Sequence, residues 1–142
     1  MAVNFSESKT KENLMRAFAG ESQARNRYTF AAEQCRREGM QSIGGIFLYT
    51  ADQELAHARR FYELLKPETG TTIFIDGSYP VDEPGSVQDL LQAAAHNENE
   101  EAVDVYPAFA RIAKEEGFYE AASTFMQIAE IEAMHRGSEE HT

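Results

Sequence analysis

The sequence predicts an all-α protein built as a four-helix bundle, with one long crossover connection between its two halves. Three observations favour this fold. Apolar residues recur at helical spacing over four long segments, glycine and proline interrupt these segments at only a few places, and the two halves of the chain repeat one another. With 142 residues, the chain 1–142 is expected to form a single domain with its own core.

The first two helices are expected over residues 8–37 and 41–66. One face of the first segment is mostly apolar, and Gly39 follows it as a C-terminal stop. The second should end before Pro67, because proline lacks the backbone N–H that a helix interior requires. The link between them is short, so the two helices should be antiparallel neighbours.

The crossover is expected over residues 67–85, which contain three of the four prolines and three glycines. Ser86 is a plausible N-cap for a third helix over 86–116. Gly117 ends that helix, and a fourth is expected over 118–137. One short link within each half and one long connection between the halves give ferritin-like connectivity.

The two halves align on the Glu-Gly pairs that end the first and third helices. Glu54 and Glu132 each lie 15 residues after the glycine of their half, and His57 matches His135 in the same way. Both Glu-x-x-His pairs interrupt an otherwise apolar helix face. The repeat therefore predicts two equivalent positions in the bundle interior.

Upstream of the Glu-Gly pairs the two halves differ by one residue. Tyr28 and Tyr106 each lie 11 residues before the glycine, but Glu21 lies 18 before it and Glu98 lies 19 before it. One extra residue inside a continuing helix is what a π-bulge accommodates, and such bulges are frequent at functional sites. The other interpretation is a helix merely kinked by Pro107.

Each predicted helix places glutamate within its apolar face. Ionised carboxylates gathered in a core repel one another and lose hydration, so protons or cations must compensate them. Two divalent metal ions would do so, and a bundle site for two metals uses one Glu from each of two helices and Glu-x-x-His from each of the other two. The candidate ligands are Glu21, Glu54, His57, Glu98, Glu101, Glu132 and His135.

Glu101 has no counterpart in the first half, where Ala24 occupies the matching position. This asymmetry offers one metal a choice between Glu101 and His57. Tyr28 and Tyr106 lie about two helical turns beyond Glu21 and Glu98, so they either donate hydrogen bonds beside the metals or are ordinary core aromatics.

The composition excludes several classes of partner. A net charge of −11 argues against nucleic acid and against anionic membrane surfaces. The sequence has no apolar stretch of the roughly 18 residues that a membrane span needs, and no signal peptide is evident. A single cysteine, Cys35, allows neither a disulfide within the chain nor a tetrathiolate metal site. We therefore expect a cytoplasmic protein.

Four strings of the sequence resemble the rubrerythrin family and span nearly the whole chain. They are ENLMRAFAGESQARNRY at 12–28, ELAHARRF at 54–61, NENEEAVDVYPAFARIAKEEGF at 97–118 and IAEIEAMH at 128–135. As a set they are far more specific than the ligand spacing alone. The resemblance implies a ferritin-like non-haem di-iron centre, with two iron ions, that reduces hydrogen peroxide to water in oxidative stress defence.

By the same resemblance, Glu54 and Glu132 would bridge the irons. One iron would move from a carboxylate to a histidine on reduction, and the matching residues here are Glu101 and His57. Tyr28 and Tyr106 match tyrosines that line the site and, with His57, are candidates for catalytic roles. The full set of matching iron ligands is Glu21, Glu54, Glu98, Glu101, Glu132 and His135.

Typical rubrerythrins also carry a rubredoxin domain with a four-cysteine iron site, whereas this sequence has one cysteine. It resembles the shorter, rubredoxin-free members. Electrons would then come from a separate protein such as a rubredoxin. The resemblance also implies a homodimer or a larger homo-oligomer.

The same ligand pattern is compatible with two other functions. The centre could oxidise ferrous iron for storage or buffering, as in ferritins, or it could hold a redox-inert ion as a structural element. Carboxylate-rich ligation suits iron or manganese better than structural zinc, although zinc binds such sites tightly enough to substitute.

Overall fold

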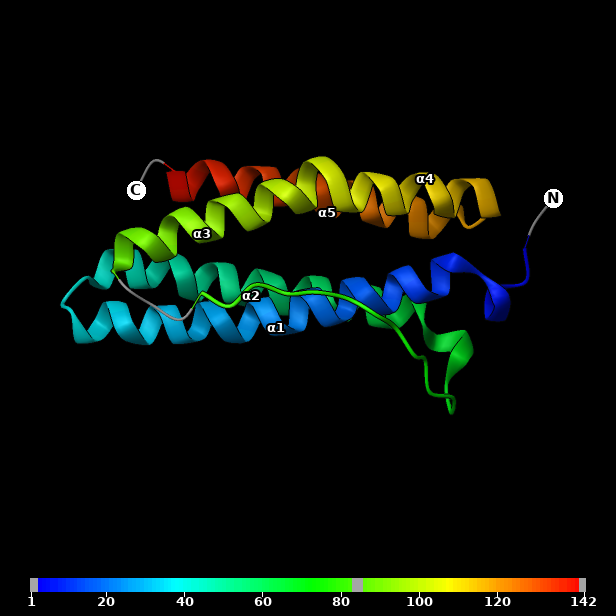
Figure 1. Cartoon of the computed structure of the whole chain (residues 1–142), viewed down its shortest axis with the longest axis horizontal. Helices are drawn as coiled ribbons and strands as arrows, with labels where there is room; N and C mark the ends of the chain where they lie inside the picture. Colours follow the sequence, from blue (N-terminus) through cyan, green and yellow to red (C-terminus); the bar gives the residue numbers. More distant parts are fainter. Residues whose placement is uncertain (1–2, 83–85, 141–142) are drawn as a thin grey trace.

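The computed structural model describes residues 3–82 and 86–140, with the side chains of 135–140 outside that description. Two antiparallel helical hairpins pack against each other as the two layers of a bundle (Figure 1). Helices α1 and α2 form one hairpin, and α5 packs against α3 and α4 in the other. The elements are α1 (Lys9–Arg37), α2 (Gln41–Leu64), α3 (Val87–Glu100), a π-helix (Glu101–Val105), α4 (Tyr106–Glu116) and α5 (Tyr119–Glu140), with short 3₁₀ turns at Phe5–Glu7 and Lys66–Glu68.

The helix ends fall where the turn residues predict them. Gly39 and Gly117 have φ angles of 76° and 92°, a left-handed conformation that glycine adopts without steric cost. Ser86 caps α3 through a reciprocal pair of hydrogen bonds with Asp89. Helix α2 ends at Leu64, two residues earlier than expected, because Pro67 lies in the 3₁₀ turn that follows.

The third predicted helix continues from Val87 to Glu116, but it contains five residues of π-helix. Glu101 and Val105, at the ends of this segment, both have right-handed helical dihedrals, so the chain does not break. The π-helix therefore holds the extra residue that distinguishes the second half from the first. Pro107 follows it directly, in the first turn of α4.

The crossover runs in extended form along the outside of the α1–α2 layer (Figure 1). Its described residues form no strand. Two ion pairs fasten it to α1: Arg16 lies 2.7 Å from Asp76, and Arg27 lies 3.2 Å from Asp82. The side chain of Asn97 on α3 also donates a hydrogen bond to Asp82, at 3.1 Å. The connection is thus attached to both layers.

Two separate hydrophobic clusters form the core. On α1, Leu14 belongs to one cluster and Tyr28 to the other, and Glu21 lies between them in sequence. On α2, which is antiparallel to α1, the order of the clusters is reversed, with Phe47 and Phe61 on either side of Glu54. The glutamates therefore occupy a polar layer between two apolar regions.

Helix α5 extends to Glu140, three residues beyond the predicted end at 137. None of the helices in the described part of the chain is long and apolar enough to cross a membrane.

Candidate metal centre

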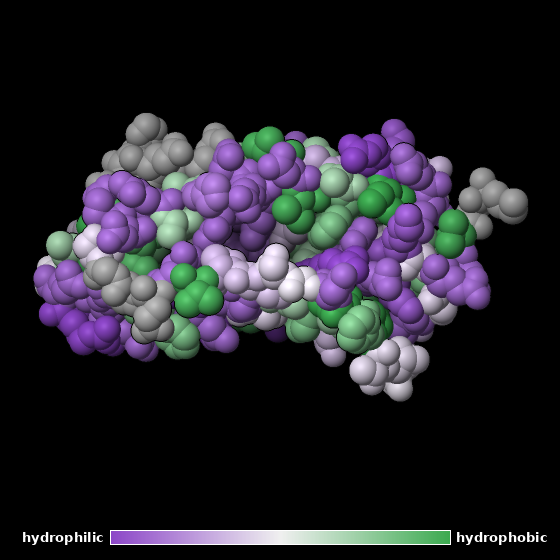
Figure 2. Space-filling view, viewed as in Figure 1, coloured by the Kyte–Doolittle hydropathy of each residue, from purple (hydrophilic) through white to green (hydrophobic). Residues whose placement is uncertain are grey.

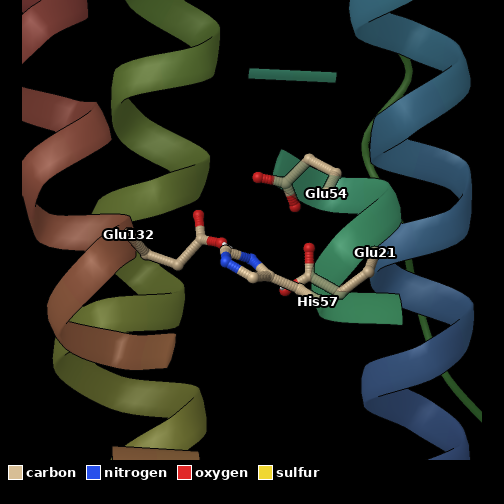
Figure 3. Close-up of side chains that lie close together, drawn as sticks. All are labelled: Glu21, Glu54, His57 and Glu132. Atoms are coloured by element: carbon tan, nitrogen blue, oxygen red, sulfur yellow. Dashed lines mark hydrogen bonds and ion pairs between the residues drawn. The ribbon is translucent and has the colours of Figure 1, made fainter. Parts of the chain in front are cut away.

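Four acidic and imidazole side chains from three helices meet in the polar layer (Figure 3). Glu21 comes from α1, Glu54 and His57 from α2, and Glu132 from α5. Each offers a ligand atom that lies within 4.8 Å of those of the other three. All four side chains are buried, with at most 3% of any residue exposed. The spacing of three residues between Glu54 and His57 places both on the inner face of α2.

Hydrogen bonds and short contacts link these side chains across the bundle. Nδ1 of His57 lies 3.1 Å from Oε1 of Glu132 and 3.6 Å from Oε1 of Glu21. The hydroxyl of Tyr106 donates a hydrogen bond of 2.9 Å to the same Oε1 of Glu21. The first residue of α4 is therefore tied to α1 through this carboxyl group.

Burial dominates the electrostatics of the centre. It raises the pKa of Glu21 to about 8, although the hydrogen bond from Tyr106 acts in the opposite direction. Burial also raises the pKa of Glu132 to about 8, and the nearby charge of Glu21 adds to that effect. The pKa of Glu101 rises well above its ordinary value, first by burial and then by repulsion from Glu132 and Glu21. Without cations, the folded protein holds protons here at neutral pH.

The donor set fits a pair of divalent cations. Carboxylate oxygens and imidazole nitrogens are suitable ligands for iron, manganese and zinc. Oε2 of Glu21 and Oε2 of Glu101 are buried and receive no hydrogen bond within the described part of the chain. Buried oxygens without donors are costly unless a cation or a proton compensates them. The same clustering that raises these pKa values would attract metal ions.

The other predicted site residues differ in burial and in their contacts with this group of four. Glu98 is only 1% exposed but does not belong to the group of four. Glu101, in the π-helix, is partly exposed as a residue, yet its carboxyl group interacts with Glu132. Tyr28 is buried, with its ring 6.0 Å from that of Phe47. His135 lies on α5, but its side chain is outside the described part of the structure.

A pocket of about 220 Å³, which no sequence pattern indicates, lies beside the centre. It is bounded by α1, by the π-helix and α4, and by residues 77–80 of the crossover. Glu101 and Tyr106 both line it. The sequence indicates only a connection at Tyr79, because the position of this residue beside the site depends on how the crossover folds back along α1.

A four-helix bundle of ferritin-like connectivity, with a buried carboxylate and histidine centre, defines the class of this protein. Within that class, the chain belongs to the rubrerythrin family, whose sequence model matches residues 12–138. The resemblance found in the four sequence strings is thereby confirmed.

Individual relatives agree with this assignment. A rubrerythrin of Porphyromonas gingivalis is 52% identical over 128 residues, which cover 90% of this chain and 62% of that protein. A rubrerythrin of Nitratidesulfovibrio vulgaris is 42% identical and is matched over 65% of its length. The chain thus spans somewhat less than two thirds of these two relatives.

Solved structures of nigerythrin have the same fold. A mixed-valence form is 34% identical, with a TM-score of 0.82, and the match covers 97% of this chain and 71% of that one. A fully reduced form, described as all ferrous, has a TM-score of 0.81 at 33% identity. The all-α ferritin-like fold predicted from the sequence is confirmed.

Proposed function

We propose that this chain is a non-haem di-iron peroxidase that reduces hydrogen peroxide to water in oxidative stress defence. The observation that carries the proposal is the buried cluster of Glu21, Glu54, His57 and Glu132 at the centre of the bundle. Nigerythrin, which shares the fold, has been solved in mixed-valence and all-ferrous forms. Iron that changes oxidation state in such a bundle supports a redox role rather than a structural one.

The metal ligands of the proposal are the glutamates and histidines that interrupt the apolar helix faces. Glu54 and Glu132 are proposed to bridge the two irons, and Glu101 and His57 are proposed as alternative ligands of one iron. Repulsion between Glu101 and its neighbours supports its place at the centre. The full proposed set is Glu21, Glu54, His57, Glu98, Glu101, Glu132 and His135.

When bound, two ferrous ions would supply the two electrons that, with two protons, convert hydrogen peroxide into two water molecules. The protein residues contribute positioning and protons. Burial raises the pKa of Tyr106 well above its ordinary value, so its hydroxyl remains a hydrogen-bond donor at neutral pH. The two hydrophobic clusters exclude bulk water from the ends of the polar layer. Tyr28, buried in one of these clusters, is proposed as a second tyrosine lining the site.

The first experiment loads the protein anaerobically with ferrous iron, counts metal per chain, and follows ferric absorbance after stoichiometric hydrogen peroxide or oxygen. Two irons per chain, oxidised quickly by peroxide and slowly by oxygen, are expected. Rapid turnover with oxygen and continued iron uptake would instead indicate ferrous iron oxidation or iron buffering. A centre that retains only zinc or manganese and shows no redox change would point to a structural role.

A matched pair of variants tests the site itself. Glu54→Ala removes a proposed bridging ligand and should abolish the two-metal stoichiometry. Glu63→Ala removes an exposed carboxylate from the same helix and should bind metal as the unmodified protein does. Two irons per chain and peroxide turnover retained in Glu54→Ala would rule out the assignment.

We further propose that the protein is cytoplasmic, that it accepts electrons from a separate donor protein such as a rubredoxin, and that it forms a homodimer or larger homo-oligomer. Three exposed apolar residues at seven-residue spacing on α2, Leu48, Leu55 and Tyr62, support self-association. The solution masses of the native protein and of Leu55→Glu test whether the chain self-associates through this surface.

The electron donor is tested separately, by following the reoxidation of a reduced rubredoxin by the protein in the presence of peroxide.

A further inference from the structure

Small molecules must reach the carboxylate centre from the side of the bundle. One hydrophobic cluster, containing Phe61 and Phe125, closes the polar layer toward one end. The other, containing Phe47 and Leu91, closes it toward the opposite end. Close-packed side chains of this size leave no path for a hydrated molecule along the bundle axis.

The pocket of about 220 Å³ provides a lateral path. Its inner wall includes Glu101 and Tyr106, and Tyr106 hydrogen-bonds to Glu21 of the centre. Its outer wall is residues 77–80 of the crossover. In the space-filling view, the surface is hollowed between the crossover and the helix above it (Figure 2). The pocket thus connects the molecular surface with residues that touch the centre.

Tyr79 is one of the residues of the outer wall. The ring packs against Gly20, the residue before Glu21, where an added Cβ atom would be in ordinary van der Waals contact with it, 3.7 Å from Cε1. The ring also lies against Gly77, where an added Cβ would come within 3.2 Å of the Tyr79 hydroxyl oxygen. The residue is 42% exposed, so one side of the ring contacts protein and the other faces solvent. Tyr79 therefore stands between solvent and the pocket.

Ion pairs with α1 hold the crossover on both sides of Tyr79, and neither of them involves the tyrosine ring. Asp76, three residues before it, pairs with Arg16, and Asp82, three residues after it, pairs with Arg27. The Tyr79 hydroxyl makes only a long contact of 3.5 Å with the backbone oxygen of Arg16. The ring is thus held near the pocket by its anchored neighbours.

The polar lining suits a small, neutral, hydrogen-bonding molecule. Both arginines of the lining are neutralised, Arg16 by Asp76 and Arg27 by Asp82. Arg27 also donates to the side chain of Gln23 at 2.6 Å. Glu100 and Glu101 also line the pocket, so its charges do not favour an anion, and the side chains of Gln23 and Asn97 are polar walls.

We propose that this pocket is the access route to the metal centre and that Tyr79 is a specificity-determining residue, which admits molecules of the size of hydrogen peroxide and excludes bulky organic hydroperoxides. The choice of oxidant rests on the peroxidase function proposed above, whereas the route itself does not. Replacing the ring with a methyl group should widen the opening without touching the centre.

The route is tested first without peroxide, using Co²⁺ alone as the probe. Metal-free protein is mixed with Co²⁺, and the appearance of its visible absorption bands gives the loading rate. Tyr79→Ala should load severalfold faster than the unmodified protein. Tyr79→Phe, which keeps the ring, and Tyr49→Ala, which removes an exposed tyrosine from α2, should load at the unmodified rate.

Size selection is tested with the iron-loaded protein as the ratio of kcat/KM for cumene hydroperoxide to that for hydrogen peroxide. This ratio should rise severalfold in Tyr79→Ala and stay unchanged in Tyr79→Phe and Tyr49→Ala. An unchanged value of either readout in a folded Tyr79→Ala protein would overturn the inference. If no variant turns over any peroxide, the proposed function fails, and the Co²⁺ loading rate alone decides the route.

Discussion

The hydroxyl of Tyr106 donates a 2.9 Å hydrogen bond to Oε1 of Glu21, across the interface between the two helical hairpins. Tyr106 is the first residue after the π-helix, and Glu21 lies on α1. Both are at most 2% exposed. The bond therefore joins the irregular helix to the carboxylate cluster inside the bundle, where water cannot replace it.

Tyr106→Phe should destabilise the metal-free protein, because it removes a hydrogen bond to a buried carboxyl group and leaves an acceptor without its donor. The expected loss is about 1–3 kcal/mol in the free energy of unfolding, measured by urea denaturation at pH 7. The variant should also raise the pKa of Glu21 further, since the tyrosine bond lowers it. Unchanged stability would mean that another donor takes the place of the hydroxyl. Phe109→Leu, a change to a partly buried neighbour without a hydroxyl, is the packing control.

Metal-free protein should lose stability as the pH rises from about 5 to 8. Burial raises the pKa of Glu21 and of Glu132 to about 8, above the ordinary value of 4.5. Between these values the folded state binds more protons than the unfolded state, so the free energy of unfolding falls with pH, by at most about 1.4 kcal/mol per pH unit for each group. Melting temperatures of metal-free protein across this range test the sign.

Replacing both carboxyls in Glu21→Gln/Glu132→Gln should weaken this pH dependence, because neutral amides neither bind nor release protons here, while Glu101, whose pKa burial also raises, still titrates. Metal binding should reverse it in the unmodified protein, because a bound cation requires the deprotonated ligands. Loading with Zn²⁺ in weak buffer at pH 7 should therefore release protons, which a pH indicator detects. Absence of proton release on stoichiometric binding would contradict the raised pKa values.

Deleting Val103 should turn the π-helix into ordinary α-helix. The residue is 59% exposed, so its loss removes little packing, and it lies within the π-helix that holds the extra residue of the second half. The spacing between Glu98 and Tyr106 would fall from eight residues to seven, which is the spacing of the buried Glu21 and Tyr28 on α1. Seven residues make about two α-helical turns, so both side chains should still face inward. Metal stoichiometry should therefore stay close to that of Val103→Ala, and circular dichroism should show helix in both.

Glu116 links the end of α4 to the start of α1. Its carboxylate accepts hydrogen bonds from the backbone N–H groups of Lys9 and Thr10, at 2.9 and 2.8 Å, and from the Thr10 hydroxyl. Glu116→Ala should cost about 1–2 kcal/mol, as the loss of a helix N-cap does, while exposed Glu115→Ala should cost little. Urea denaturation of both variants measures the difference.

The same carboxylate gives a pH test of opposite sign. Partial burial acts to raise the pKa of Glu116, but the hydrogen bonds from Thr10 and Lys9 outweigh it and hold the pKa below its usual value. Its contribution is therefore present above the unfolded pKa near 4.5 and is lost as the pH falls through the lower folded value. The stability difference between the unmodified protein and Glu116→Ala should shrink below about pH 4. A constant difference would mean that the carboxylate charge contributes nothing.

The helix boundaries could be predicted from the sequence because the residues that start and end helices act locally. Gly39 and Gly117 end helices and Ser86 starts one through contacts within a single turn, so their positions in the sequence give the boundaries. The π-helix could be predicted for another reason. The two halves of the chain repeat each other, and comparing the positions of Glu21 and Glu98 in the repeat shows one extra residue in the second half. The placing of glutamates on apolar faces likewise predicted the buried layer, because helical periodicity fixes which residues share a face.

The rest depends on contacts that no local pattern encodes. Asp76 and Asp82 are ordinary acidic residues of a glycine- and proline-rich connection until the crossover meets Arg16 and Arg27. The contact between Nδ1 of His57 and Glu132 depends on how α5 packs against α2 and on the rotamers of both side chains. Such details require the assembled bundle.

The separation of the core into two clusters also bears on how the protein folds. The polar layer interrupts the apolar interior, so the two clusters do not contact each other directly. In the metal-free protein, the unfolding of one cluster is therefore coupled to that of the other through the helices that pass through both. Helix α1 does so with Leu14 at one end and Cys35 at the other. Metal ions bound between the two clusters would connect them. Thermal unfolding should therefore become more cooperative when metal binds, because the metal couples two cores that the polar layer otherwise separates.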